Sequence, residues 1–203
     1  FDDYKGNKEI TLFDGEDQKL SYTLSAKETN ISTSDLYFVP SAVTDSTVTF
    51  TAEAAQGKSL TIEYRLGADY MLHMKMYAEG MQGLFAPGTQ TMDVNWKDKC
   101  RQQEKGFMFE NRYATLTYHN TDGGTDYLSE TSAEEDEPTE EKTDWIAFKN
   151  QFFSAVMIAK DNFDKGALLT SVPQEKGSGY LKQYEANLKA FFDPSGNKPS
   201  EFE

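Results

Sequence analysis

Alternation of apolar and polar side chains, residue by residue, constrains the fold of this chain more than any other feature. The segment 46–54 (STVTFTAEA) places Val48 and Phe50 on one face and threonines on the other. The segments 59–66 (SLTIEYRL) and 70–80 (YMLHMKMYAEG) repeat the pattern after short turns. A period of two is typical of β-strands with one buried and one wet face, so these segments predict an antiparallel meander.

Weaker alternating segments continue through most of the chain. They are separated by DGEDQ, APGTQ, TDGGTD and similar sequences, whose glycine, proline and aspartate residues favour tight turns. The weaker strands are predicted over residues 9–13, 19–25, 35–39, 91–97 and 114–120. Trp96 shares its alternation face with other apolar residues and is expected in the core. Many short strands between turn signals predict an all-β fold, a sandwich or a barrel.

The segment 144–159 (DWIAFKNQFFSAVMIA) is the most apolar stretch of the chain. Trp145 and Phe152 follow helical spacing, but Val156–Ile158 would then make the opposite face of the helix apolar too, unlike a surface helix. Two strands buried on both faces, turning near Lys149–Gln151, fit the all-β context better. Periodicity alone does not exclude a helix over this segment.

Two further points concern the apolar segments. The longest part of 144–159 without charged or amide side chains has eight residues, whereas a membrane-spanning helix needs roughly 20, so no transmembrane segment is expected. The segment 180–192 (YLKQYEANLKAFF) is ambiguous between a strand and a helix. A strand would align Tyr184, Ala186, Leu188, Ala190 and Phe192; a helix would align Leu181, Tyr184, Leu188 and Phe191.

The charge of the chain argues against a nucleic-acid partner. The formal net charge is −14, and no cluster of lysine and arginine forms a phosphate-binding patch. The segment 129–143 contains SETSAEEDEPTEEK, with seven acidic residues and no apolar side chain larger than alanine. Such a sequence buries too little surface to order on its own, so an acidic, disordered loop is expected, with an acidic docking segment as the alternative.

Few residues qualify as chemical groups of a site. The single cysteine, Cys100, excludes an internal disulfide and a cysteine-based zinc site. Basic neighbours could activate its thiolate, but no histidine lies nearby in the sequence, so an inert thiol is expected. His73 and His119 fall on predicted polar strand faces, where a mutarotase-like site would need them to converge with carboxylates on a sugar. No spacing supports that, and exposed or hydrogen-bonded strand histidines are expected.

Two acidic, glycine-containing sequences, HNTDGGTD and DNFDKG, resemble parts of calcium loops. Neither supplies the full ligand set of an EF-hand, so plain turns are expected. We therefore predict no catalytic, cofactor-binding or metal-binding residues.

The order of several segments resembles a known family. ENRYATLTYHN (110–120), followed after a variable loop by 144–159, is similar to the periplasmic domain of the bacterial membrane-protein insertase YidC. That family has a tryptophan-led segment, an aromatic pair and a small-residue apolar strand in this order, here Trp145, Phe152–Phe153 and Ser154–Ile158. ITLFDGED…LSYTL and SDLYFVP are softer matches, and the resemblance covers most of 9–192.

The resemblance implies a single periplasmic β-supersandwich domain over 1–203, galactose-mutarotase-like in fold, tethered to the inner membrane. It implies a non-catalytic role in an insertase that helps nascent inner-membrane proteins insert and fold, alone or with Sec translocon components such as SecD and SecF. The chain, which starts at Phe1, is expected to be a soluble, monomeric fragment without the family's last strand and membrane-leading helix. The alternative is a carbohydrate-binding or mutarotase-like periplasmic protein.

Overall fold

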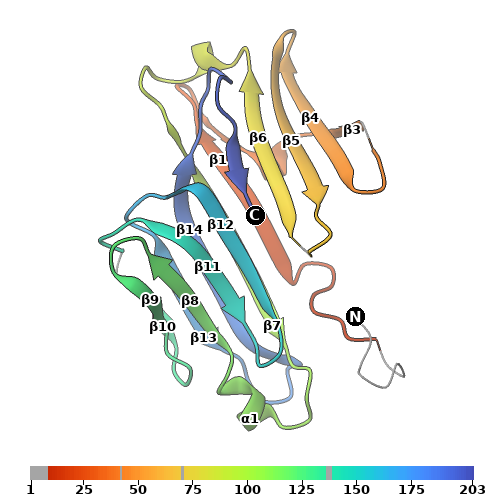
Figure 1. The fold of residues 1–203 in the computed structure, drawn as a ribbon, viewed down its shortest axis with the longest axis vertical. Helices are drawn as coiled ribbons and strands as arrows, with labels where there is room; N and C mark the ends of the chain where they lie inside the picture. The colour runs from red at the N-terminus through yellow and green to blue at the C-terminus, as the bar shows by residue number, and fades with distance from the viewer. Residues whose placement is uncertain (1–8, 42, 70, 136–138) are drawn as a thin grey trace.

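The computed structural model describes residues 9–41, 43–69, 71–135 and 139–203, and these form a nearly all-antiparallel β structure (Figure 1). The first half of the chain contains β1 (Gln18–Ser25), β2 (Asn30–Ser32), η1 (Thr33–Asp35), β3 (Val39–Ser41), β4 (Thr47–Ala55), β5 (Lys58–Leu66), β6 (Leu72–Glu79), η2 (Gln82–Leu84) and β7 (Thr91–Arg101). The second half contains α1 (Phe107–Asn111), β8 (Thr115–Asn120), β9 (Gly124–Tyr127), β10 (Glu134–Glu135), β11 (Thr143–Lys149), β12 (Ser154–Phe163), β13 (Leu168–Pro173), β14 (Tyr180–Phe191) and β15 (Ser200–Phe202).

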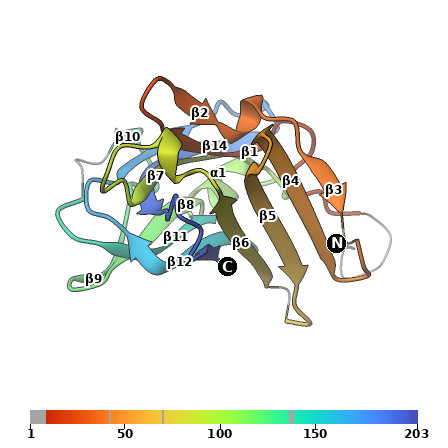
Figure 2. The same cartoon turned by 90° about the horizontal axis from the view of Figure 1, so that it is seen from above.

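The strands form two layers that face each other. Layer A has the order β2-β1-β7-β14-β13-β10, and layer B has the order β9-β8-β11-β12-β15-β6-β5-β4-β3. The layers are joined where β12 reaches β14, at the pair Phe163 and Ala190. Figure 2, seen from above, shows β14 and β1 in the upper part of the picture and β11, β12 and β6 in the lower part. The fold is therefore an all-β sandwich made from one curled sheet.

Aromatic side chains fill the space between the layers. Tyr22 of β1 lies against Phe202 of β15, with ring centroids 5.9 Å apart. Phe148 of β11 stacks on Tyr184 of β14 at 5.2 Å. The hydroxyl of Tyr184 donates to the carbonyl oxygen of Lys149 at 2.9 Å, so this buried polar group is satisfied. A chain of low mean hydropathy thus builds its core from large rings.

The predicted meander is confirmed. β4, β5 and β6 pair in sequence order, with Phe50 opposite Ile62 and Ile62 opposite Met76. The strands predicted over 19–25, 91–97 and 114–120 are also present, and Trp96 is buried in the core. The segment 180–192 is a strand, because Tyr184, Ala186, Leu188 and Ala190 of β14, with the following Phe192, are all buried as the strand alignment requires.

Two predicted strands are wrong. Residues 9–13 carry an isolated bridge at Glu9 and no continuous ladder. The side chain of Gln103 donates instead to the carbonyl of Thr11, which ties this segment to the end of the sandwich. Residues 35–39 begin in the η1 turn, where the Ser32 hydroxyl accepts from the Ser34 N–H. This turn chemistry overrides the local alternation, and the strand starts only at Val39.

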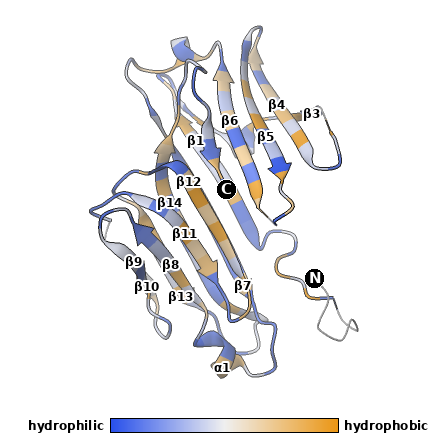
Figure 3. Ribbon diagram, in the orientation of Figure 1, coloured by the Kyte–Doolittle hydropathy of each residue, from blue (hydrophilic) through white to orange (hydrophobic). Residues whose placement is uncertain are grey.

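The segment 144–159 forms two strands and not a helix, with the turn between Lys149 and Ser154. Figure 3 shows β11 and β12 as the most continuous hydrophobic ribbons. The expectation that these strands are buried on both faces is wrong, because Val156 is 45% exposed. Layer A covers the inner face of the pair, and within the described ranges no third layer covers its outer face.

The acidic segment 129–143 has defined backbone partners in its described part. β10 pairs with β13, and the N–H of Gly166 donates to the carbonyl of Thr139 at 2.7 Å. Residues 136–138 lie outside the described residues. The expected disorder of this segment and the galactose-mutarotase likeness both stay predictions. No helix within the described ranges has the length and apolar character that crossing a bilayer requires.

Candidate interaction surface

A row of side chains crosses the outer face of layer B. The register places His119 opposite Trp145 and Trp145 opposite Ile158. Ile158 exchanges two backbone hydrogen bonds with Glu203, at 2.8 and 3.0 Å. Directly opposite residues of antiparallel strands point to the same side of a sheet. The row therefore gathers side chains from β8, β11 and β12 and from the residue after β15.

The row continues beyond Glu203 into the meander. Phe202 is paired with Met74, which sets Glu203 beside His73, and His73 is opposite Arg65. The face thus combines residues that are far apart in the sequence. Alternation identifies which residues of one strand share a face, but it does not show that β15 lies between β12 and β6.

One half of this face is an apolar hollow of about 360 Å³. Its centre is formed by Trp145, Ala147, Val156 and Ile158, from β11 and β12. The ring of His119 stacks along Trp145 with an interplanar angle of 12°, which fixes the edge of the hollow. Val156 is exposed, Trp145 and Ile158 are half-buried and Ala147 is buried. An apolar hollow of this kind marks a surface suited to a ligand or partner.

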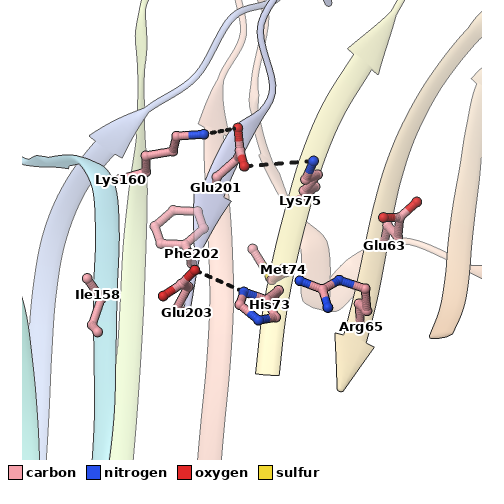
Figure 4. A pocket seen from close by; sticks show the side chains of 10 residues that line it. All are labelled: Glu63, Arg65, His73, Met74, Lys75, Ile158, Lys160, Glu201, Phe202 and Glu203. Atoms are coloured by element: carbon pink, nitrogen blue, oxygen red, sulfur yellow. Dashed lines mark hydrogen bonds and ion pairs between the residues drawn. The ribbon is translucent and has the colours of Figure 1, made fainter. Parts of the chain in front are cut away.

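The other half is a charged hollow of about 440 Å³, lined from β5, β6, β12 and β15 (Figure 4). Ile158 lines both hollows, so they are adjacent on this face. In Figure 4, Glu201 lies between Lys160 and Lys75, with N–O distances of 2.8 and 3.8 Å. The hydrogen bond from Lys160 holds the pKa of Glu201 below its usual value. Lys160, Lys75 and Glu201 are thus paired with one another and still partly open to solvent.

The two histidines each bond to a different carboxylate. His73 Nδ1 lies 2.9 Å from Glu203 Oε1, and His119 Nδ1 lies 2.8 Å from Asp144 Oδ1. Three strands, β11, β12 and β15, separate β8 from β6. The histidines therefore do not converge on one sugar-sized position, and the geometry does not favour the mutarotase-like alternative.

The remaining candidate groups sit in structural positions. Cys100 is buried, and burial raises the pKa of its thiol well above the usual range. HNTDGGTD forms the turn between β8 and β9, where Gly124 adopts a φ of 90°. DNFDKG begins in β12 and ends in the turn before β13. Among the described residues, no group of three or more histidine, cysteine, aspartate or glutamate side chains has the arrangement of a metal site.

The outer face of layer A has a different character. Lys97 and Glu185 form an ion pair at 3.0 Å, and Lys189 bonds to Asp93 at 2.8 Å. This face is a ladder of paired charges on adjacent strands. The central strands β7 and β14 of this face thus carry paired charges, whereas the apolar hollow lies on layer B.

Comparison with known proteins agrees with this all-β architecture and its order of segments. The family model described as YidC periplasmic domain matches residues 2–200. This chain belongs to the YidC periplasmic domain family. It is 46% identical over 204 residues to the membrane protein insertase YidC of Phocaeicola vulgatus. The aligned residues make up 99% of this chain and 32% of that protein.

Other YidC proteins show the same partial coverage. The Bacteroides fragilis protein is 38% identical over 195 residues, covering 96% of the chain and 31% of that protein. The Parabacteroides distasonis protein is 32% identical over 201 residues, covering 98% of the chain and 31% of that protein. The chain thus spans about a third of the length of these relatives. The YidC assignment places it as a periplasmic domain of an inner-membrane insertase.

Proposed function

We propose that this YidC periplasmic domain is a non-catalytic interaction module of a membrane-protein insertase. The outer face of layer B would hold apolar segments of inner-membrane proteins while they await insertion. The observation that carries the proposal is that the apolar hollow and the charged hollow lie side by side, with Ile158 lining both. The relatives' name, membrane protein insertase, supports the choice of client.

The chemistry of the two hollows fits such a client. A membrane-spanning segment has an apolar stretch with charged or aromatic residues at its ends. The apolar stretch would cover Trp145 and Val156, and its polar end would reach Lys160, Glu201 and Glu203. Both signs of charge are present there, so ends of either charge would find a partner. Apolar burial would supply the affinity, and the ion pairs would orient the segment.

Two finer parts of the proposal concern assembly. We propose contact with Sec translocon components, SecD and SecF among them, through the full-length protein. The paired charges on layer A support its use as a polar, transient contact surface. We also propose that the chain itself is monomeric. Its outermost strands are short: β2 and β3 have three residues each, and Pro40 lies in β3, features that discourage edge-to-edge pairing.

Site-specific photo-crosslinking tests the proposed surface. A photoreactive phenylalanine analogue replaces Val156 on layer B or Val172 on layer A, two exposed valines on opposite outer faces. The purified chain is then irradiated with a lysine-flanked leucine/alanine peptide. We expect the yield of peptide adduct at position 156 to be at least about tenfold higher than at position 172, because one apolar contact changes affinity by about this factor. Equal yields at the two positions would overturn the assignment of the surface.

A matched substitution gives a second readout. Val156→Lys should lower peptide affinity about tenfold, because it places an ammonium in the apolar hollow. Val172→Lys should leave affinity unchanged. Thermal unfolding of both variants establishes that the fold is retained. Turnover of aldoses, abolished by His73→Ala or His119→Ala, would contradict the non-catalytic role.

A further inference from the structure

A second exposed apolar cluster lies at the end of the sandwich that carries α1, at the bottom of Figure 1. Met108 is 66% exposed and Phe109 is 59% exposed, and Tyr113 and Phe152 are also exposed. We call these four residues the tip patch. They belong to α1, the residues after it, and the turn between β11 and β12. This patch is distinct from the outer face of layer B and contributes no residue to either hollow.

The register brings the parts of the tip patch to one end of the molecule. Thr115, the first residue of β8, is opposite Lys149, the last residue of β11. The chain segment after α1 therefore lies beside the turn that carries Phe152. The rings of Phe109 and Tyr113 meet edge to face with centroids 5.4 Å apart.

A fully buried carboxylate fixes the orientation of α1. Glu110 is 0% exposed and accepts hydrogen bonds from the backbone N–H groups of Gln103 and Glu104, with N–O distances of 2.9 to 3.1 Å. Phe107 is buried on the same side of the helix. Because Phe107 and Glu110 face inward, Met108 and Phe109 are held outward. Large apolar side chains kept in water in this way indicate a surface that is covered in use.

The charge around the tip patch differs from that of the whole chain. Lys105 and Arg112 flank it and are exposed, whereas the acidic Glu110 is buried and the exposed acid of the loop is Glu104. The whole chain carries a net charge of −14. Aromatic side chains with flanking lysine and arginine are typical of groups that enter the headgroup region of a bilayer.

We infer that the tip patch docks on the surface of a lipid bilayer with anionic headgroups. Met108 and Phe109 enter the boundary between headgroups and acyl chains, Tyr113 and Phe152 lie at headgroup level, and Lys105 and Arg112 contact lipid phosphates. A bilayer suits the patch better than a protein groove, since these side chains stand out from the end of the fold and accept a deformable partner. Docking would bring Lys149 and Ser154, at the near edge of the apolar hollow, close to the membrane.

Co-sedimentation with sucrose-loaded vesicles tests this inference. The purified chain is mixed with vesicles of phosphatidylethanolamine and phosphatidylglycerol in a ratio of about 3:1, so that about a quarter of the lipid is anionic. We expect the chain to sediment with the vesicles, and Met108→Asp combined with Phe109→Asp to weaken partitioning about tenfold or more. Tyr37→Asp is the matched control, because Tyr37 is 85% exposed and lies before β3, away from α1.

Charge variants separate headgroup contact from apolar insertion. Lys105→Glu combined with Arg112→Glu should weaken binding to the anionic vesicles about tenfold and leave any weak binding to pure phosphatidylcholine vesicles unchanged. Thermal unfolding confirms that each variant is folded. The inference is overturned if the unaltered chain does not sediment with anionic vesicles, or if tip variants and Tyr37→Asp bind equally.

Discussion

Phe148 of β11 stacks on Trp96 of β7, with ring centroids 3.9 Å apart and an interplanar angle of 23°. Tyr184 of β14 lies on Phe148 as well, so one ring from layer B contacts two rings from layer A. Phe148 is 3% exposed. This stack is the clearest physical link between the layers beyond the backbone connection near Phe163.

Truncation of Phe148 should therefore weaken the whole sandwich. We expect Phe148→Ala to lower the free energy of unfolding by about 3–5 kcal/mol, because it removes a buried ring and leaves a cavity between Trp96 and Tyr184. Urea unfolding followed by tryptophan fluorescence measures the change. Phe152→Ala is the control: it removes an exposed ring and should change stability by no more than about 0.5 kcal/mol. Similar losses in the two variants would contradict the interlayer role.

Asp98 gives the stability of the domain a pH dependence. Burial raises the pKa of Asp98 to about 6, with a further contribution from the nearby Asp17 carboxylate. The unfolded chain has an aspartate pKa of about 3.9. Between these values the folded state binds a proton that the unfolded state does not, so stability falls as pH rises from about 4 to about 6.

Asp98→Asn should remove this part of the pH dependence. Between pH 4 and pH 8, burial of Asp98 should cost the unaltered chain about 2–3 kcal/mol of its free energy of unfolding. The variant should not show this loss. Urea unfolding at the two pH values measures the difference. Asp122→Asn, in the exposed turn between β8 and β9, should show no such gain. A variant whose pH profile runs parallel to that of the unaltered chain would refute the effect of burial.

Lys182 ties the acidic segment to the core. It is 0% exposed, and its ammonium group donates to the carbonyl oxygens of Glu130 at 2.9 Å and Ser129 at 3.4 Å. Burial lowers the pKa of this lysine. Lys182→Met should therefore release the start of the acidic segment, with about tenfold faster cleavage there by a glutamate-specific protease.

Mass spectrometry of timed digests locates those cuts. Lys189→Met, on the outer face of layer A, is the control and should digest at the original rate. If segment 129–143 is cleaved at once in the unaltered chain, the disorder expected from its composition holds, and Lys182 does not restrain it.

Cys100 should be unreactive in the folded chain. Its sulfur lies 4.0 Å from the carbonyl oxygen of Lys149, and burial keeps the thiol protonated. We expect alkylation by iodoacetamide at pH 8 to be at least about 100-fold slower in buffer than in urea. Thr125→Cys adds an exposed thiol that should react at once in the folded chain. Equal labelling of both thiols in buffer would show that this part of the core opens readily.

The sequence predicts strands well where alternation is long and turns are clear. Alternation identifies β4, β5 and β6 directly, since each has eight or nine residues. It fails at 9–13 and 35–39, where short segments make turn or side-chain contacts instead. It also misjudges the outward side chains of β12, such as Val156. A functional apolar face gives the same local pattern as a strand buried on both sides.

The candidate surface was beyond sequence reasoning for a different reason. Its row joins His119, Trp145, Ile158, Glu203 and His73, which come from strands widely separated along the chain. Local periodicity carries no information on which distant strands become neighbours. The histidines were predicted to lie on polar strand faces, and they do, but their carboxylate partners were not identified. The tip patch was missed because a helix as short as α1 leaves too few residues for a periodic pattern.

The position of β15 has a consequence for the order in which the domain is assembled. Ser200–Phe202 is synthesised after every other strand of layer B, yet it separates β12 from β6 and pairs with both. Until those residues arrive, the hydrogen-bonding edge of β6 is unprotected beside Met74 and Met76. An unpaired edge with apolar neighbours is prone to aggregation, and distant pairings form slowly. Layer B is therefore completed only after the last strand of this chain has been synthesised and has paired with β12 and β6.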